Sequence, residues 1–182
     1  MTKKFLILGL GNPGKTYQNT RHNIGWNFVS WLKDQYQTSS SWQIEKKNFA
    51  QISVFENQNK KIIFALPLVF MNETGKTIKQ LQKYYQVLPK NIIVVHDDND
   101  IYVGNFKFSF DRGSAGHKGV EAIIKNLGLK KFYRLRIGIQ PKREQRKKAE
   151  NLVLKKFSPK ERETITENFV LMKKAVEEKI KS

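Results

Sequence analysis

The sequence predicts an α/β fold, a single three-layer domain over residues 1–182 with a mixed, mostly parallel twisted sheet flanked by helices. Short apolar runs alternate along the chain with segments whose apolar residues repeat at helical spacing. One pair of strand-like segments is joined by a short polar turn, as in a β-hairpin. A chain of 182 residues with 39% hydrophobic residues is long enough to bury one sizeable core.

Three strands and two helices are expected in the N-terminal half. They are, in order, a strand at Lys4–Leu10, a helix at Asn23–Tyr36, strands at Phe49–Glu56 and Lys61–Leu66, and a helix at Thr74–Val87. The first strand is continuously apolar, which is typical of a strand covered on both faces. The polar segment Asn57–Lys60 predicts the hairpin turn between the next two. The helices carry apolar residues three or four positions apart, as at Ile78, Leu81 and Tyr85.

The C-terminal half is expected to hold three strands and two helices. They are strands at Asn91–His96, Asn105–Phe110 and Tyr133–Ile139, a short helix at Gly119–Leu127, and a final helix that opens at Ser158. Ser158 and Glu161 have the spacing of a capping box, and Pro159 occupies the first helical position. One continuous helix is predicted from there, with Ile165, Phe169, Met172, Val176 and Ile180 on its buried face. The basic run Lys142–Lys148 is expected to be solvated.

Positive charge dominates the composition. The chain has 34 Lys and Arg against 16 Asp and Glu, a formal net charge of +18. A field of this sign attracts polyanions, so nucleic acid is the favoured partner. A membrane is disfavoured, since no basic amphipathic terminus, signal peptide or spanning apolar run is recognisable. The chain has no cysteine, which excludes thiolate chemistry and disulfides and fits a cytoplasmic location.

The first strand runs into Gly9-Leu10-Gly11-Asn12-Pro13-Gly14, which matches the G-x-G-x-x-G pattern of dinucleotide-binding loops. Such a loop places its amides at the mouth of a helix, whereas Pro13 lacks an amide and the expected helix begins only near Asn23. The acidic residue expected after a second strand is also missing. We therefore interpret the glycines as allowing a sharp turn that places Asn12 at the carboxyl edge of the sheet.

Any histidine general base must be one of only three, His22, His96 and His117. His22 lies in the loop before the first helix. His96 and Asp97 end a strand, and because successive strand residues point to opposite faces, only one of them can face a given site from the strand. Asp97 is a natural partner for a histidine from a neighbouring loop. The acidic run His96–Asp100 could instead be a solvated turn or a weak Mg²⁺ site, although it lacks the ligand spacing of an EF-hand.

Nucleophilic catalysis has no good candidate. There is no cysteine, and Gly113-Ser114-Ala115-Gly116 misses the G-x-S-x-G nucleophile elbow by one residue. A water molecule activated by histidine is the simplest hydrolytic chemistry that remains.

The sequence closely resembles the bacterial peptidyl-tRNA hydrolase family. The matching blocks, in family order, are LILGLGNPGKTYQNTRHNIG, PLVFMNETGKTI, IIVVHDDND, GSAGHKGVEAII and FYRLRIGI. They extend to about residue 140, and the last part of the chain matches only loosely. The first block is the most specific, because its Asn-Pro-Gly, tyrosine and Thr-Arg-His-Asn elements rarely coincide at these spacings.

The resemblance implies an enzyme that hydrolyses the ester bond between a peptide and the 3′ end of tRNA, without metal or other cofactor and as a monomer. It implies that His22 is the general base and that Asp97 orients it. It also assigns hydrogen bonds to substrate and water, the lining of the cleft, and the binding of the tRNA 5′-phosphate. Asn12 and Asn72 would bond to substrate and water. Tyr17, Asn23 and Met71 would line the cleft, and Lys107 and Arg136 would bind the 5′-phosphate.

One position departs from the family pattern. The family usually has Gly-Gly-His-Asn-Gly, whereas this chain reads Gly116-His117-Lys118-Gly119. Lysine donates hydrogen bonds but cannot accept them, so Lys118 must bind substrate differently. It either turns outward to tRNA phosphates, which we favour, or places a cation near the ester carbonyl.

Two other functions compete with the hydrolase. A non-catalytic RNA-binding relative would keep the basic surface and lose the site, and the presence of Asn12, His22, Asn72 and Asp97 argues against it. A metal-dependent or nucleotide-binding enzyme is disfavoured by the form of the glycine loop.

Overall fold

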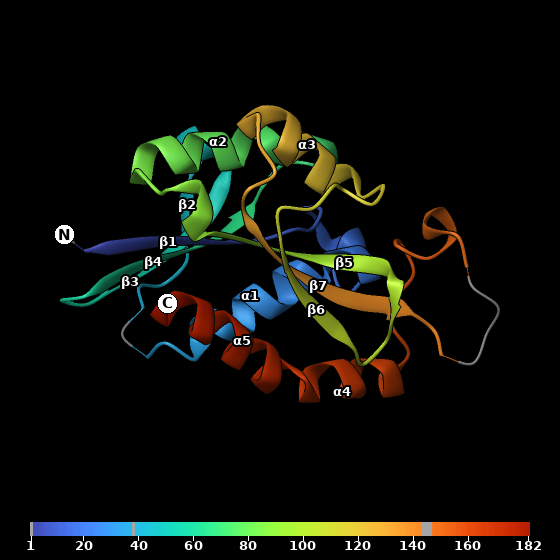
Figure 1. Cartoon of the computed structure of the whole chain (residues 1–182). Helices are drawn as coiled ribbons and strands as arrows, with labels where there is room; N and C mark the ends of the chain where they lie inside the picture. Colours follow the sequence, from blue (N-terminus) through green and yellow to red (C-terminus); the bar gives the residue numbers. More distant parts are fainter. Residues whose placement is uncertain (1, 38, 143–146) are drawn as a thin grey trace.

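A seven-stranded mixed sheet lies between two layers of helices (Figure 1). This architecture comes from a computed structural model that describes residues 2–37, 39–142 and 147–182. Residues 143–146, inside the basic run expected to be solvated, lie outside the described part. The predicted fold class is confirmed.

The strand order in the sheet is β2-β3-β4-β1-β5-β7-β6. The strands are β1 (Lys3–Gly9), β2 (Gln43–Glu45), β3 (Ala50–Glu56), β4 (Lys60–Pro67), β5 (Ile92–Tyr102), β6 (Phe106–Phe110) and β7 (Tyr133–Gln140). The four central strands, β4, β1, β5 and β7, run parallel, and β3, β2 and β6 pair antiparallel outside them. Parallel strands bring their carboxyl ends to one edge, so the loops after β1, β4 and β5 meet there.

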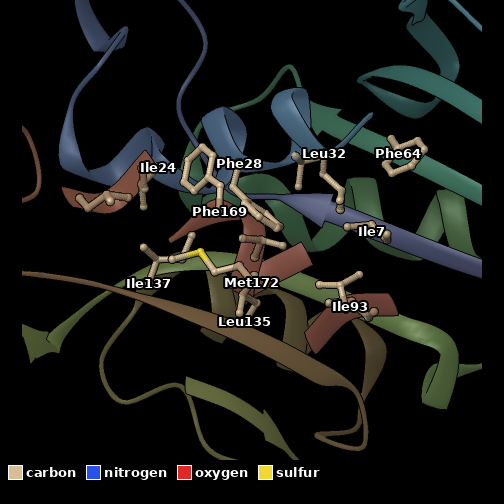
Figure 2. Close-up of a cluster of buried hydrophobic side chains, with 14 of the residues drawn as sticks. Ile7, Ile24, Phe28, Leu32, Phe64, Ile93, Leu135, Ile137, Phe169 and Met172 are labelled. Carbon is tan, nitrogen blue, oxygen red and sulfur yellow. The ribbon is translucent and has the colours of Figure 1, made fainter. Parts of the chain in front are cut away.

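Helices cover both faces of the sheet. They are α1 (Ile24–Asp34), α2 (Thr74–Tyr85), α3 (Lys118–Leu127), α4 (Pro159–Glu167) and α5 (Phe169–Lys181). Alternate residues of β1 serve different layers: Phe5 and Ile7 belong to the core under α1 and α5, and Leu6 and Leu8 to the core under α2 and α3. Figure 2 shows the first of these cores, where Met172 of α5 packs among residues of the sheet and α1.

Two sequence predictions need correction, and one strand was missed. The strand expected at Asn91–His96 is longer, because β5 continues to Tyr102. The short edge strand β2 was not predicted. The C-terminal helix is broken into α4 and α5 at Asn168, whose Nδ2 donates to the carbonyl oxygens of Thr164 and Gly104. The predicted apolar face remains buried across this break.

The glycine-rich loop allows α1 to lie directly against β1. A side chain at Gly25 would collide with the carbonyl oxygen of Val95, and one at Gly9 would lie 2.5 Å from the carbonyl oxygen of Gly25. A Cβ at Gly11 would lie 2.7 Å from the Trp26 ring. The backbones also bond directly, since the Trp26 amide donates to the Leu10 carbonyl at 3.2 Å. Gly9 and Gly11 therefore make room for α1, a role different from the sharp turn that the sequence predicted for these glycines.

Gly25→Ala is expected to destabilise the protein by about 2 kcal/mol or more, because backbone atoms cannot make way for the new methyl group. Urea unfolding measures the effect. Gly113→Ala is the matched control, since nothing lies within 4 Å of the Cβ it would gain, and it should change stability by less than about 0.5 kcal/mol. Equal stability of the two variants would contradict the close approach of α1 to β1.

Candidate active site

The Asp97 carboxylate joins two histidines that come from different parts of the fold. Asp97 lies in β5, and its side chain is only 3% exposed. Its Oδ1 atom lies 2.8 Å from His22 Nδ1 and 2.8 Å from His117 Nε2. The two imidazole rings are 5.0 Å apart between centroids. The structure thus brings two of the three predicted catalytic residues, His22 and Asp97, into direct contact, and the third is Asn12.

The hydrogen bonds assign the protons on both rings. His117 caps α3, and its Nδ1 accepts from the amides of Gly119 and Val120 at 3.2 and 3.4 Å. The proton of a neutral His117 therefore sits on Nε2 and is donated to Asp97. His22 donates its Nδ1 proton to the same oxygen, which leaves the lone pair on its Nε2 free. Nε2 is thus the nitrogen of His22 that can accept a proton.

The charges around His22 favour its protonated form. Burial lowers its pKa, but the charge and hydrogen bond of Asp97 outweigh burial, so the pKa is raised above its usual value of 6.5. Lys118 opposes this rise slightly. Burial by itself would raise the pKa of Asp97, but the two neighbouring histidines hold that pKa well below its usual range. Asp97 is therefore a carboxylate whenever His22 works as a base.

His96 is buried and packs against His117. It is 1% exposed, and its ring makes an edge-to-face contact with His117 at 4.7 Å. Its Nδ1 lies 2.6 Å from the Asp97 carbonyl oxygen, and its buried Nε2 has no hydrogen-bond partner among the described residues. Burial, with the charge of His117, lowers its pKa well below the usual value, so His96 stays neutral. It is a packing partner of His117, with no exposed nitrogen for chemistry.

The loop that carries His22 is held by the C-terminal segment. The amides of Arg21 and His22 donate to the carbonyl oxygens of Lys155 and Val153, each at 2.9 Å. Residues far apart in sequence therefore form a short ladder beside the site, and the backbone of His22 is fixed independently of its side chain.

Arg21 extends the same connection to α4. Its buried guanidinium donates to the Ile139 carbonyl oxygen at 2.9 Å and to both carboxylate oxygens of Glu161 at 2.9 and 2.8 Å. Phe157 covers the guanidinium, 4.6 Å from it. Glu161 also completes the capping box with Ser158, as predicted. One carboxylate therefore both starts α4 and anchors the residue next to His22.

Asn12 is held at its backbone by the Asn23 side chain and at its side chain by Met71. The Asn23 side chain accepts from the Asn12 amide and donates to the Asn12 carbonyl, both at 2.9 Å. Asn12 Oδ1 accepts from the Met71 amide at 2.9 Å, which directs its Nδ2 group to act as the donor. Both the oxygen and the nitrogen of the Asn23 side-chain amide bond to the Asn12 backbone. The Asn23 side chain therefore lies against the backbone of Asn12.

Apolar side chains surround this polar centre. Met71 is buried and packs closely on Gly119 of α3. Tyr17 is half-buried and meets Phe70 edge to face at 6.1 Å, and Phe70 is 51% exposed. Asn72 is exposed next to Met71. These residues come from the loops after β1 and β4, and sequence reasoning did not identify Phe70 as one of them.

Lys107 and Arg136 face each other on neighbouring strands, as directly opposed residues of β6 and β7. Lys107 is exposed, whereas Arg136 is half-buried and donates from Nε to Asp98 Oδ2 at 2.7 Å. An arginine held through Nε keeps its terminal nitrogens for an incoming anion. Lys118 is exposed at the first residue of α3, beside His117.

His22, Asp97 and His117 are also the one set of residues in the described part whose ligand atoms lie close enough to hold a metal ion, within 4.8 Å of one another. The present arrangement already satisfies these atoms, because both ring N–H groups donate to the carboxylate. The bond from His117 to Asp97 was missed from the sequence. The only available signal was the presence of a third histidine just before a helix.

Comparison with known proteins identifies the architecture. A family model described as peptidyl-tRNA hydrolase matches residues 6–182. The chain belongs to the peptidyl-tRNA hydrolase family. The peptidyl-tRNA hydrolase of Mycoplasma capricolum is 41% identical over 164 residues, 90% of this chain and 86% of that protein. The one from Mycobacterium tuberculosis is 36% identical over 162 residues, 89% of this chain and 83% of that protein.

Solved structures of peptidyl-tRNA hydrolases share the fold. The Acinetobacter baumannii structure superposes with a TM-score of 0.85 at 30% identity, covering 97% of this chain and 88% of that one. A complex of peptidyl-tRNA hydrolase with N-propanol gives a TM-score of 0.87 at 29% identity. In the described part of this chain, no helix is both long and apolar enough to cross a membrane.

Lys118→Asn is expected to raise the pKa of His22, because it removes a positive charge that disfavours the imidazolium. Titration of the His22 ring signals by NMR measures this shift directly. Lys118→Arg keeps the charge and should leave the pKa at the wild-type value. If Lys118→Asn and the wild type titrate together, the ammonium group points away from His22.

Proposed function

We propose that this peptidyl-tRNA hydrolase family member hydrolyses the ester bond between a peptide, or an N-blocked amino acid, and the 3′ end of tRNA. The observation that carries the proposal is the His22–Asp97 pair, in which the bond through Nδ1 leaves Nε2 of His22 as the proton acceptor. The net charge of +18 supports a nucleic-acid substrate. Its product would be free tRNA, recovered from stalled or aborted translation.

In the proposed mechanism, His22 Nε2 takes a proton from a water molecule as that water attacks the ester carbonyl. Asp97 stabilises the imidazolium that forms and keeps the proton of the other ring nitrogen in place. The tetrahedral intermediate then collapses, and His22 returns its proton to the departing 3′ oxygen of the tRNA. The cycle needs no nucleophilic side chain, consistent with a chain that lacks cysteine.

Substrate positioning falls to the residues around this centre. Asn12 Nδ2 and the Asn72 amide would donate to the carbonyl oxygen as it gains charge. Tyr17 and Met71, together with Phe70, would contact the peptide and the terminal adenosine. Asn23 would act through Asn12, whose backbone it holds at both the amide and the carbonyl.

We infer that residues 1–182 act as one catalytic domain and as a monomer in the cytoplasm, without a metal or other cofactor. A single sheet supports both the catalytic loops and the pair Lys107–Arg136, which supports the assignment of one domain. The absence of cysteine is consistent with a reducing compartment.

His22→Ala should reduce single-turnover hydrolysis of a purified N-acetyl-aminoacyl-tRNA by about 10²–10⁴-fold, the usual contribution of a general base. The assay contains EDTA, and the wild type should remain active in it. Affinity for deacylated tRNA should be unchanged, because the base contributes to chemistry and the basic surface to binding. A variant with wild-type rates would remove His22 from the mechanism.

Replacing both Lys107 and Arg136 by Ala should raise KM for full-length substrate by at least about tenfold, the effect of losing charge-assisted bonds to the 5′-phosphate. The same variant is compared on a substrate that lacks a 5′-phosphate. Equal losses on the two substrates would show that these residues do not bind that group.

A further inference from the structure

The exposed side of α2 carries a row of lysines. Lys76, Lys79 and Lys83 follow one another at spacings of three and four residues, and all three are exposed. None of them forms an ion pair among the described residues. Ile78 and Leu81, on the opposite side of the helix, are fully buried in the core. All charged residues of α2 are therefore cationic and lie on its solvent side.

The two helical layers differ in how they balance charge. Together, α2 and α3 contain five lysines and one acidic residue, Glu121. Together, α4 and α5 contain six basic and five acidic residues, and they include the Lys173–Glu177 ion pair. A general abundance of lysine in this protein would affect both layers alike. The excess on α2 and α3 is therefore a property of that face of the molecule.

The lysine row works against the helix that carries it. Lys76 and Lys79 are three residues apart, and Lys79 and Lys83 are four apart, so each pair lies close on the helix surface. Like charges at these spacings destabilise an isolated helix, and none of the three lysines forms an ion pair with a described acidic side chain. A bound polyanion would supply the missing negative charge. Tyr84, 69% exposed in the last turn of the same helix, adds an aromatic ring of the kind that favours RNA over a polyanion without bases.

The row begins at the candidate active site. The residues just before α2 include Met71, whose amide bonds to Asn12. The Thr74 hydroxyl donates to the carbonyl oxygens of Met71 and of Gly119, and so ties the first turns of α2 and α3 together. From this junction the lysines run about 10 Å along the helix, at 1.5 Å per residue.

The row and the pair Lys107–Arg136 lie on different sides of the site. α2 packs against α3 and over β1, near the middle of the sheet, whereas β6 is the edge strand beyond β7 (Figure 1). An RNA whose 3′ end enters the site between these two basic regions could contact both. A second contact of this kind would fix the direction in which the RNA leaves the site.

We propose that the α2 lysine face, defined as Lys76, Lys79 and Lys83, binds the phosphate backbone of the tRNA beyond its 3′ end. The assignment rests on the proposed function, and it adds a phosphate-binding surface separate from the 5′-phosphate pair. Ammonium groups along a helix neutralise phosphates as point charges, so this contact is independent of nucleotide sequence.

The test compares the triple variant K76Q/K79Q/K83Q with the matched control K160Q/K174Q/K181Q. The control removes the same charge from exposed lysines of α4 and α5. The dissociation constant for deacylated tRNA is measured by fluorescence anisotropy at several salt concentrations. The α2 variant should bind at least about tenfold more weakly, and its slope of log affinity against log salt should be shallower by roughly two to three. The control should stay close to wild type.

Either of two results would overturn the proposal. One is wild-type affinity and slope for the α2 variant, and the other is an equal loss in both variants, which would mean that only total charge matters. Circular dichroism verifies folding, and K76R/K79R/K83R, which keeps the charges, should bind tRNA like the wild type. Hydrolysis by the unmodified protein is measured in parallel. Its absence would refute the proposed function, whereas normal hydrolysis with unchanged binding of the α2 variant would refute this inference alone.

Discussion

The carboxylate of Asp97 accepts hydrogen bonds from two histidines that approach it from opposite layers of the fold. His22 comes from the loop that leads into α1, and His117 from the loop that leads into α3. One oxygen atom therefore sets the tautomer of both rings and the position of the free nitrogen of His22. A buried carboxylate is unstable without such partners, so the site is held together by the same bonds that tune its chemistry.

Much of the remaining structure keeps these groups in place. Gly9 and Gly25 let α1 approach β1 so closely that its first turn lies at the carboxyl edge of the sheet. The C-terminal segment then fixes the loop from outside, through backbone bonds and through the pairing of Arg21 with Glu161. The C-terminal segment, whose sequence matches the family only loosely, is in this way directly connected to the loop of the candidate base. The connection is structural, because none of these partners reaches the free nitrogen of His22.

Positive charge is concentrated on the side of the molecule that carries the candidate active site. The first turns of α2 and α3 both lie beside the candidate active site. The positive ends of their dipoles add there to the positive charge of Lys118. The pair Lys107–Arg136 adds positive charge on β6 and β7, where Arg136 also pairs with Asp98. On the other layer, Glu residues offset the lysines. A polyanion is thus attracted to the face that carries the site, while the opposite layer remains close to neutral.

The sequence by itself determined the fold class, the capping box at Ser158, and the roles expected of His22 and Asp97. The fold class and the capping box depend on local patterns, namely hydrophobic period and helix capping, which are complete within short segments. The roles expected of His22 and Asp97 came instead from the resemblance of the sequence blocks to the peptidyl-tRNA hydrolase family. Only the tertiary structure decided that His117 shares the Asp97 oxygen, that Asn23 serves Asn12, and that Arg21 pairs with Glu161 across 140 positions of the chain. The break at Asn168 was also invisible in the sequence, because the apolar spacing continues through it while a bond to Gly104 holds the bend. Such choices depend on which segments the sheet brings together, and no segment contains that information alone.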